Sequence, residues 1–267
     1  MDITLKSLLQ EMWADYCDLN PEAKRIYDLI KNKGEDVIND HIALRTFNHN
    51  KINIEVLSQA YLKLGYVKAQ KEYIFKEKNL KAYHFEHPDS SLPKIFISEF
   101  NLEKGSDFLK STVLNMIEQI PNELIANPRF TCSGAVWEKS YEVYKRLKEE
   151  SEYAAWVYAI GFRPNHFTVS MNHLKGFSDL EDLNSFIKEN GYELNSSGGQ
   201  IKGTPQELLE QSSTMAKRIS IEFKEGTFEI PGCYYEFAKR YQDSNGVLYQ
   251  GFIAASADKI FESTNSK

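Results

Sequence analysis

Two short segments decide how this chain folds: DHIALRTF at residues 40–47 and RPNHFTVSM at residues 163–171. Both have the alternating, partly β-branched pattern of a strand, and each carries one histidine, His41 in the first and His166 in the second. Each segment also opens a stretch whose pattern predicts a strand, a helix and three further strands. We therefore predict an α+β fold in which one β-rich module occurs twice.

The first module covers residues 41–100. After its histidine strand, the apolar spacing of INIEVLSQAYLKLG predicts a helix that ends at Gly65. Three segments rich in aromatic and β-branched residues then predict the remaining strands: YVKAQKEYIF, KAYHFEH and PKIFISEF.

The second module covers residues 165–241. SDLEDLNSFIKENG predicts its helix, and TPQELLEQSSTMA, at residues 204–216, predicts an additional short helix. RISIEFK, at residues 218–224, and CYYEFAKRY predict the last two strands. Both modules close with Glu-Phe, at Glu99-Phe100 and Glu236-Phe237, which suggests that these pairs occupy matching places in the duplication.

The remaining segments surround the two modules. Helical patterns occur in residues 1–35 and, as an insertion between the modules, in residues 103–160. We expect residues 242–267 to complete the pocket. Because 267 residues can bury a large core, we predict one domain over residues 1–267.

Composition narrows the classes of function. A net charge of −6 argues against a nucleic-acid partner, and no apolar run approaches the roughly 18 residues that span a bilayer. Three separated cysteines without a CxxC pair predict neither a disulfide framework nor a structural zinc site. The first residues lack the pattern of a signal peptide, so we expect a cytoplasmic location.

Alternation along a strand places His41 on one face with Arg45, and His166 on one face with Ser170. The opposite faces of both strands are mostly apolar and suit packing against helices. A buried arginine needs an anionic partner, and a carboxylate substrate is the natural one if this face lines a cavity. Alternatively, Arg45 pairs with Asp40 or with a nearby glutamate.

Two histidines and one carboxylate form a ligand set for a divalent metal. A lone strand histidine is more often a hydrogen-bonded structural residue than a ligand, and Glu236 taken alone is more often a surface residue or a salt-bridged one. The metal interpretation depends on the joint occurrence of His41, His166 and Glu236 at corresponding places in two modules. Fe(II), Mn(II) and Zn(II) all suit this set.

The paired β-α-β-β-β arrangement resembles the vicinal oxygen chelate fold, in which two modules form a curled sheet around a metal site. The resemblance implies ligands on the first and last strands of each module. Applied to this sequence, it selects His41, Glu99, His166 and Glu236.

Four motifs point to a narrower resemblance: DHIALRTF, GFRPNHFTVS, CYYEFAKRY and the C-terminal SADKIFEST. Together they resemble a family long catalogued as a domain of unknown function, number 1338. This family is now associated with 2-oxoadipate dioxygenase/decarboxylase, also called hydroxyglutarate synthase. The resemblance covers nearly the whole chain.

The family resemblance implies a role for several residues. His41, His166 and Glu236 would be the Fe(II) ligands, which leaves Glu99 outside the site. Arg45 would be the catalytic residue that recognises the substrate by holding a carboxylate. Ala255 and Ser256 stand where longer relatives have a Val-Ser pair beside the substrate.

The implied reaction is that of an Fe(II)-dependent dioxygenase and decarboxylase. A 2-oxo dicarboxylate, expected to be 2-oxoadipate, would react with O2 to give CO2 and 2-hydroxyglutarate, as in lysine breakdown. Purified protein could instead carry Zn, Ni or Mn. Two alternatives stay open: a glyoxalase-like metal-dependent lyase, isomerase or hydrolase, and a non-catalytic protein that binds a metal or a ligand.

Overall fold

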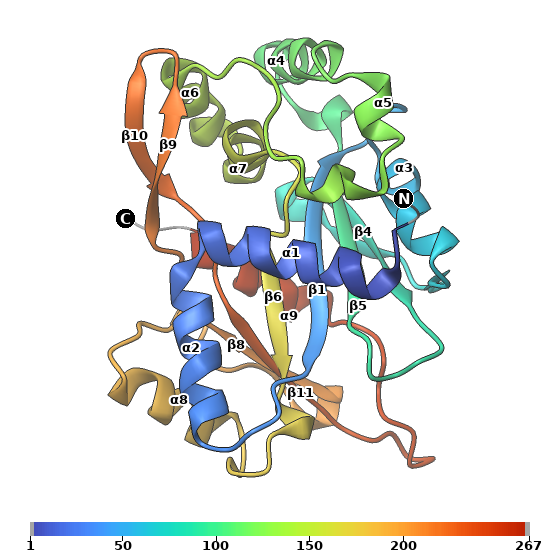
Figure 1. Cartoon of the computed structure of the whole chain (residues 1–267), viewed down its shortest axis with the longest axis vertical. Coiled ribbons are helices and arrows are strands. Elements are labelled where there is room, and N and C mark those ends of the chain that lie inside the picture. Colours follow the sequence, from blue (N-terminus) through green and yellow to red (C-terminus); the bar gives the residue numbers. More distant parts are fainter. Residues whose placement is uncertain (1–2, 265–267) are drawn as a thin grey trace.

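The two histidine-bearing segments pair with each other at the centre of one mixed sheet (Figure 1). They form strands β1 (Asn39–Phe47) and β6 (His166–Ser170), which run antiparallel. This computed structural model describes residues 3–264. Within that range nine strands belong to the central sheet.

The first module extends the sheet on one side of β1. Strand β5 (Lys94–Phe100) runs parallel to β1, and β4 (Leu80–Glu86) runs antiparallel to β5. Two short strands, β2 (Val67–Lys68) and β3 (Tyr73–Phe75), pair with β4. Helix α3 (Ile54–Lys63) connects β1 to β2.

The second module repeats this topology on the other side. Strand β11 (Glu236–Arg240) runs parallel to β6, followed by antiparallel β8 (Leu209–Ser213) and β7 (Lys202–Thr204). Helix α8 (Leu180–Glu189) corresponds to α3. The predicted α+β architecture of two β-α-β-β-β modules in one curled sheet is therefore confirmed.

Two predictions within the second module were wrong. Residues 204–216 form only a 3-10 turn, Pro205–Glu207, before β8 begins. The capping signal at Thr204 is real, because its hydroxyl accepts from the Glu207 amide, but pairing with β11 overrides helix propensity beyond the turn. Strand β9 (Arg218–Phe223) lies outside the central sheet and forms a separate hairpin with β10 (Gly226–Pro231).

Helices cover both faces of the sheet. Helix α1 (Leu5–Leu19), followed by α2 (Pro21–Asn32), crosses the front in Figure 1. The ring of Trp13 lies 5.1 Å from that of Phe167, on the apolar face of β6. Helix α9 (Ala254–Phe261) lies behind the sheet and covers the opposite, histidine-bearing face.

The segment between the modules is helical. Helix α7 (Glu152–Ile160) is buried along nearly its whole length and brings Tyr153 and Trp156 to the edge of the histidine-bearing face. The other helices of this segment are α4 (Asp107–Glu118), α5 (Asn122–Ile125) and α6 (Tyr141–Glu150). Among residues 3–264, no helix combines the length and the apolar character needed to cross a bilayer.

An approximate two-fold axis relates the modules at the contact between β1 and β6. His41 lies opposite Thr168, and His166 lies opposite Ala43. Rotating one strand onto the other therefore exchanges the two histidines, and it exchanges Ala43 with Thr168. The same rotation exchanges β5 with β11, since each runs parallel to the histidine strand of its module.

Candidate metal centre

Three side chains converge on the histidine-bearing face of the sheet. His41 extends from β1, His166 from β6 and Glu236 from β11, and each offers a ligand atom within 4.8 Å of the other two. His166 Nε2 lies 3.2 Å from Glu236 Oε2, and His41 Nε2 lies 3.6 Å from Glu236 Oε1. All three residues are buried, at 5% exposure or less.

The residue before each histidine orients its imidazole ring. Asp40 Oδ1 lies 2.8 Å from His41 Nδ1, and Asn165 Oδ1 lies 3.1 Å from His166 Nδ1. An oxygen acceptor at Nδ1 favours the tautomer with its proton there, which leaves the Nε2 lone pair facing the centre. In β1 the register shifts between Asn39 and His41, and such an irregularity re-aims side chains, here Asp40 toward its neighbour's ring.

The Nε2 atoms of both histidines face the carboxylate of Glu236, and that of His41 also lies 3.1 Å from the hydroxyl oxygen of Thr168. Burial lowers the pKa of His166, and the nearby His41 and Arg45 lower it further, so this imidazole is neutral near pH 7. Glu236 Oε2 is buried and makes no hydrogen bond with any described residue. Burial raises the pKa of Glu236, opposed by His41 and by a hydrogen bond from Gln211.

A divalent cation fits between these atoms. Two ligands about 2.1 Å from one ion lie about 3.0 to 3.4 Å apart at angles of 90° to 109°, and the distance of 3.2 Å between His166 Nε2 and Glu236 Oε2 lies in this range. A cation would also satisfy the orphaned oxygen of Glu236 and favour its ionised form. Two imidazoles and one carboxylate suit Fe(II), Mn(II) or Zn(II).

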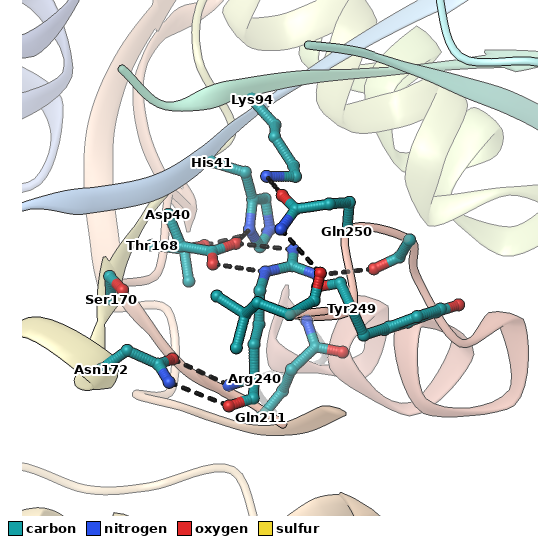
Figure 2. Close-up of polar contacts among 12 residues, drawn as sticks. Asp40, His41, Lys94, Thr168, Ser170, Asn172, Gln211, Arg240, Tyr249 and Gln250 are labelled. Carbon is teal, nitrogen blue, oxygen red and sulfur yellow. Dashed lines mark hydrogen bonds and ion pairs between the residues drawn. The ribbon is translucent and has the colours of Figure 1, made fainter. Parts of the chain in front are cut away.

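A buried arginine fixes the carboxylate behind His41. Figure 2 shows Arg240 donating from Nε to Asp40 Oδ2 at 2.6 Å and from Nη2 to Oδ1 at 2.8 Å. Nη1 of Arg240 donates to the carbonyl oxygens of Tyr249 and Gly251. Burial alone would raise the pKa of Asp40, but the Arg240 charge and the hydrogen bonds from His41 and Arg240 outweigh it and hold this pKa well below its usual range.

Glu236 is held from the neighbouring strand. Gln211 Nε2, on β8, donates to Glu236 Oε1 at 2.5 Å. Sequence reasoning missed this partner because it assigned residue 211 to a helix. Its strand position follows from pairing with β11, which no local pattern specifies.

Aromatic and aliphatic side chains enclose the centre in a cavity of about 20 Å³. Tyr234 stacks on His166 with ring centres 4.6 Å apart, and Phe252 packs edge-on against His41 at 4.8 Å. Phe96 of β5 and three residues of the C-terminal helix region complete the wall: Ala257, Ile260 and Phe261. These side chains exclude bulk water from the metal position.

Arg45 lies on the same face of β1 and is 3% exposed. Its guanidinium carbon lies 5.1 Å from the ring centres of both Tyr153 and Trp156, and 5.5 Å from that of Phe261. The Nε atom makes no hydrogen bond with a described residue. Arg45 also lines an outer cavity of about 250 Å³ whose wall includes Lys78 and three glutamates, Glu77, Glu150 and Glu152, and burial raises the pKa of Glu152 while the Arg45 charge lowers it. Unlike Arg240, Arg45 therefore keeps a donor for an anion.

The C-terminal pair lies differently from the other candidates. Ala255 is exposed, and Ser256 is buried beside Gly203 of β7. Neither residue lines the metal cavity, whose wall from this helix is made by Ala257, Ile260 and Phe261. The predicted contact of Ala255 and Ser256 with a substrate stays a prediction.

Glu99 lies away from the centre. It pairs with Thr46 in β1, its Oε2 accepts from the amide of Ile54 at the start of α3, and Lys81 lies 3.0 Å from its Oε1. Its selection by the vicinal oxygen chelate pattern was wrong, and its omission under the family resemblance agrees with the structure. The matching Glu-Phe pairs misled because the register places Glu99 and Glu236 at different points of their modules.

Comparison with solved structures supports the fold. A glyoxalase-superfamily protein from Ralstonia eutropha, 20% identical, has a TM-score of 0.76 over 93% of this chain and 85% of its own. A Shewanella frigidimarina protein described as a hydrolase is 46% identical, with a TM-score of 0.91 over 96% and 100% of the two chains. The predicted vicinal-oxygen-chelate-like fold is thereby confirmed.

Two further relatives carry a specific activity in their names. The hydroxyglutarate synthase of Oryza sativa, solved in complex with 2-oxoadipate, is 32% identical, with a TM-score of 0.86 over 97% of this chain and 91% of its own. The chloroplastic 2-oxoadipate dioxygenase/decarboxylase of Arabidopsis thaliana is 35% identical over 97% of this chain and 77% of its own. The family model described as 2-oxoadipate dioxygenase/decarboxylase matches residues 4–243. The chain belongs to the 2-oxoadipate dioxygenase/decarboxylase family.

Proposed function

We propose that this protein is an Fe(II)-dependent dioxygenase and decarboxylase that converts 2-oxoadipate and O2 into 2-hydroxyglutarate and CO2. The equation balances without a further co-substrate, because the carbon that the substrate loses leaves as CO2 and the product keeps every hydrogen atom of the substrate. One oxygen molecule supplies both added oxygen atoms. We assign the reaction to lysine breakdown because the family resemblance implies it.

The observation that carries the proposal is the buried set of His41, His166 and Glu236 beside an arginine with a free donor. Three protein ligands would leave positions open on a divalent metal, and this ligand set is typical of non-haem Fe(II) oxygenases. A dicarboxylate has a second anionic end. Arg45 supplies a cation for that end and lies on β1, the strand that also carries His41. The rice relative solved with 2-oxoadipate supports this choice of substrate.

When bound, the metal would act as a Lewis acid and as the site of the redox chemistry. His41, His166 and Glu236 would hold it, and Asp40, Asn165 and Gln211 keep those side chains in place. Other divalent metals fit the same atoms, so isolated protein can contain Zn, Ni or Mn without being active.

The remaining residues bind and orient the substrate and exclude water from the site. Arg45 fixes the far carboxylate of the substrate and thereby the position of its 2-oxo acid end. Phe96, Phe252 and Tyr234 present apolar surface to the carbon chain and exclude water. We assign Arg45 as the catalytic and substrate-binding residue. We also propose Ala255 and Ser256 as substrate-binding residues, which requires that α9 turn to bring them toward the substrate.

The test is an oxygen-electrode assay of anaerobically reconstituted Fe(II) protein with a panel of 2-oxo acids, coupled to CO2 detection. We expect 2-oxoadipate to give equal amounts of consumed O2, released CO2 and 2-hydroxyglutarate. Loss of 2-oxoadipate without O2 consumption would contradict the proposal.

A second candidate is metal-dependent hydrolysis on the same site, which the description of the Shewanella frigidimarina protein favours. It predicts turnover with Zn(II) under anaerobic conditions. The same assay decides between the two, because only the dioxygenase needs O2.

A further inference from the structure

The two-fold symmetry of the sheet applies to the histidines but not to the carboxylate. Glu236 of β11 pairs with Thr168, and Phe96 of β5 pairs with Ala43. Thr168 and Ala43 are equivalent, because they lie opposite the two histidines in the central pair of strands. Phe96 is therefore the counterpart of Glu236.

Phe96 occupies this position as part of the wall of the metal cavity. It is 5% exposed and lines the cavity together with both histidines and Glu236. Its ring lies 4.9 Å from that of Phe252, which packs on His41. A carboxylate at residue 96 would face the centre from the side opposite Glu236.

We propose that Phe96 determines the coordination number of this site: it keeps open the position that a second carboxylate would occupy. This inference rests on the proposed metal site but not on the proposed reaction. An open position is what a chelating substrate needs, whereas a fourth protein ligand would close it. An apolar ring there also keeps water from that side of the ion.

Because Phe96 and Glu236 are related by the two-fold axis, a carboxylate ligand can be moved from residue 236 to residue 96. Glu236→Ala should lose most of the metal affinity. Adding Phe96→Glu to that variant should restore two histidines and one carboxylate in mirrored positions. In the wild-type background, Phe96→Glu should add a fourth ligand.

The experiment measures Co(II) affinity and the visible Co(II) absorption spectrum of purified metal-free variants. We expect Phe96→Glu to bind Co(II) at least about tenfold more tightly than wild type, which is the lower end of the effects seen when the partner of a metal ligand is changed. Its Co(II) absorption spectrum should also differ from that of wild type. We expect Phe96→Glu in the Glu236→Ala background to recover at least about tenfold of the lost affinity.

Phe96→Gln is the matched control, since it has the shape of Glu without the anionic oxygen, and it should not tighten binding. Phe96→His supplies a neutral ligand if the buried glutamate prevents folding, and circular dichroism establishes which variants are folded. The inference is overturned if folded Phe96→Glu or Phe96→His binds Co(II) no more tightly than Phe96→Gln and neither rescues Glu236→Ala. Because no step uses turnover, a failure of the proposed dioxygenase activity leaves this result unaffected.

Discussion

Arg240 donates two hydrogen bonds to the carboxylate of Asp40, of 2.6 and 2.8 Å, and the same carboxylate lies 2.8 Å from Nδ1 of His41. The guanidinium also donates to the carbonyl oxygens of Tyr249 and Gly251, next to Phe252 on the cavity wall. One buried cation therefore fixes the orientation of a candidate ligand and the segment that covers it. Nothing in the sequence near Arg240 indicates this role, because Asp40 is 200 residues away.

Arg240→Ala tests that relationship. We expect Co(II) affinity to fall by about tenfold, the lower end of the usual cost of losing the partner of a metal ligand, because Arg240 holds Asp40, which is the partner of His41. We also expect a stability loss of about 3–5 kcal/mol, because Asp40 is left as an uncompensated buried charge. Isothermal titration with Co(II) and thermal melting measure the two effects.

Arg129→Ala is the control for this change, because Arg129 makes a similar two-bond contact with Glu11 at the surface. It should leave Co(II) affinity unchanged. Equal losses of affinity in the two variants would show that Arg240 acts only through general stability.

Removing any one of the three proposed ligands should affect metal binding, whereas removing Glu99 should not. His41→Ala, His166→Ala and Glu236→Ala should each remove measurable metal binding, because each supplies a converging ligand atom. Glu99→Ala should keep full metal occupancy and lose about 1–2 kcal/mol of stability, because its carboxylate accepts from the first turn of α3. Metal analysis after reconstitution checks the prediction, and retention of full occupancy in His166→Ala would refute the site.

Local patterns were enough for the module order and for the face that carries His41 and Arg45, because alternation and helical spacing depend on neighbouring residues. Asp40 and Asn165 could also have been found, since a polar residue precedes each histidine. The roles of Gln211, Glu99 and Phe96 could not, because they depend on which strands pair and in what register. That information lies in contacts between distant parts of the chain.

Arg45 should act on the substrate and not on the metal. We expect Arg45→Ala to raise KM for 2-oxoadipate by about 10- to 100-fold, which corresponds to losing one or two charge-assisted hydrogen bonds. KM for 2-oxohexanoate, which lacks the second carboxylate, should change little, and Co(II) affinity should stay at its wild-type value. Steady-state kinetics with both acids measure this difference. Parallel losses for the two acids would remove Arg45 from carboxylate recognition.

Phe261 lies on the wall of both cavities, the metal cavity and the outer cavity that Arg45 lines. A substrate that reaches the metal and Arg45 at once must therefore pass beside this ring. We expect Phe261→Ala to join the two spaces and to shift the ratio of kcat/KM between a seven-carbon 2-oxo dicarboxylate and 2-oxoadipate by about tenfold toward the longer acid, the order expected for one methylene. Phe228→Ala, in the hairpin strand β10, removes an aromatic side chain that lines neither cavity and should leave the ratio unchanged. An unaltered ratio in Phe261→Ala would mean that the substrate reaches the metal by a path that does not involve this residue.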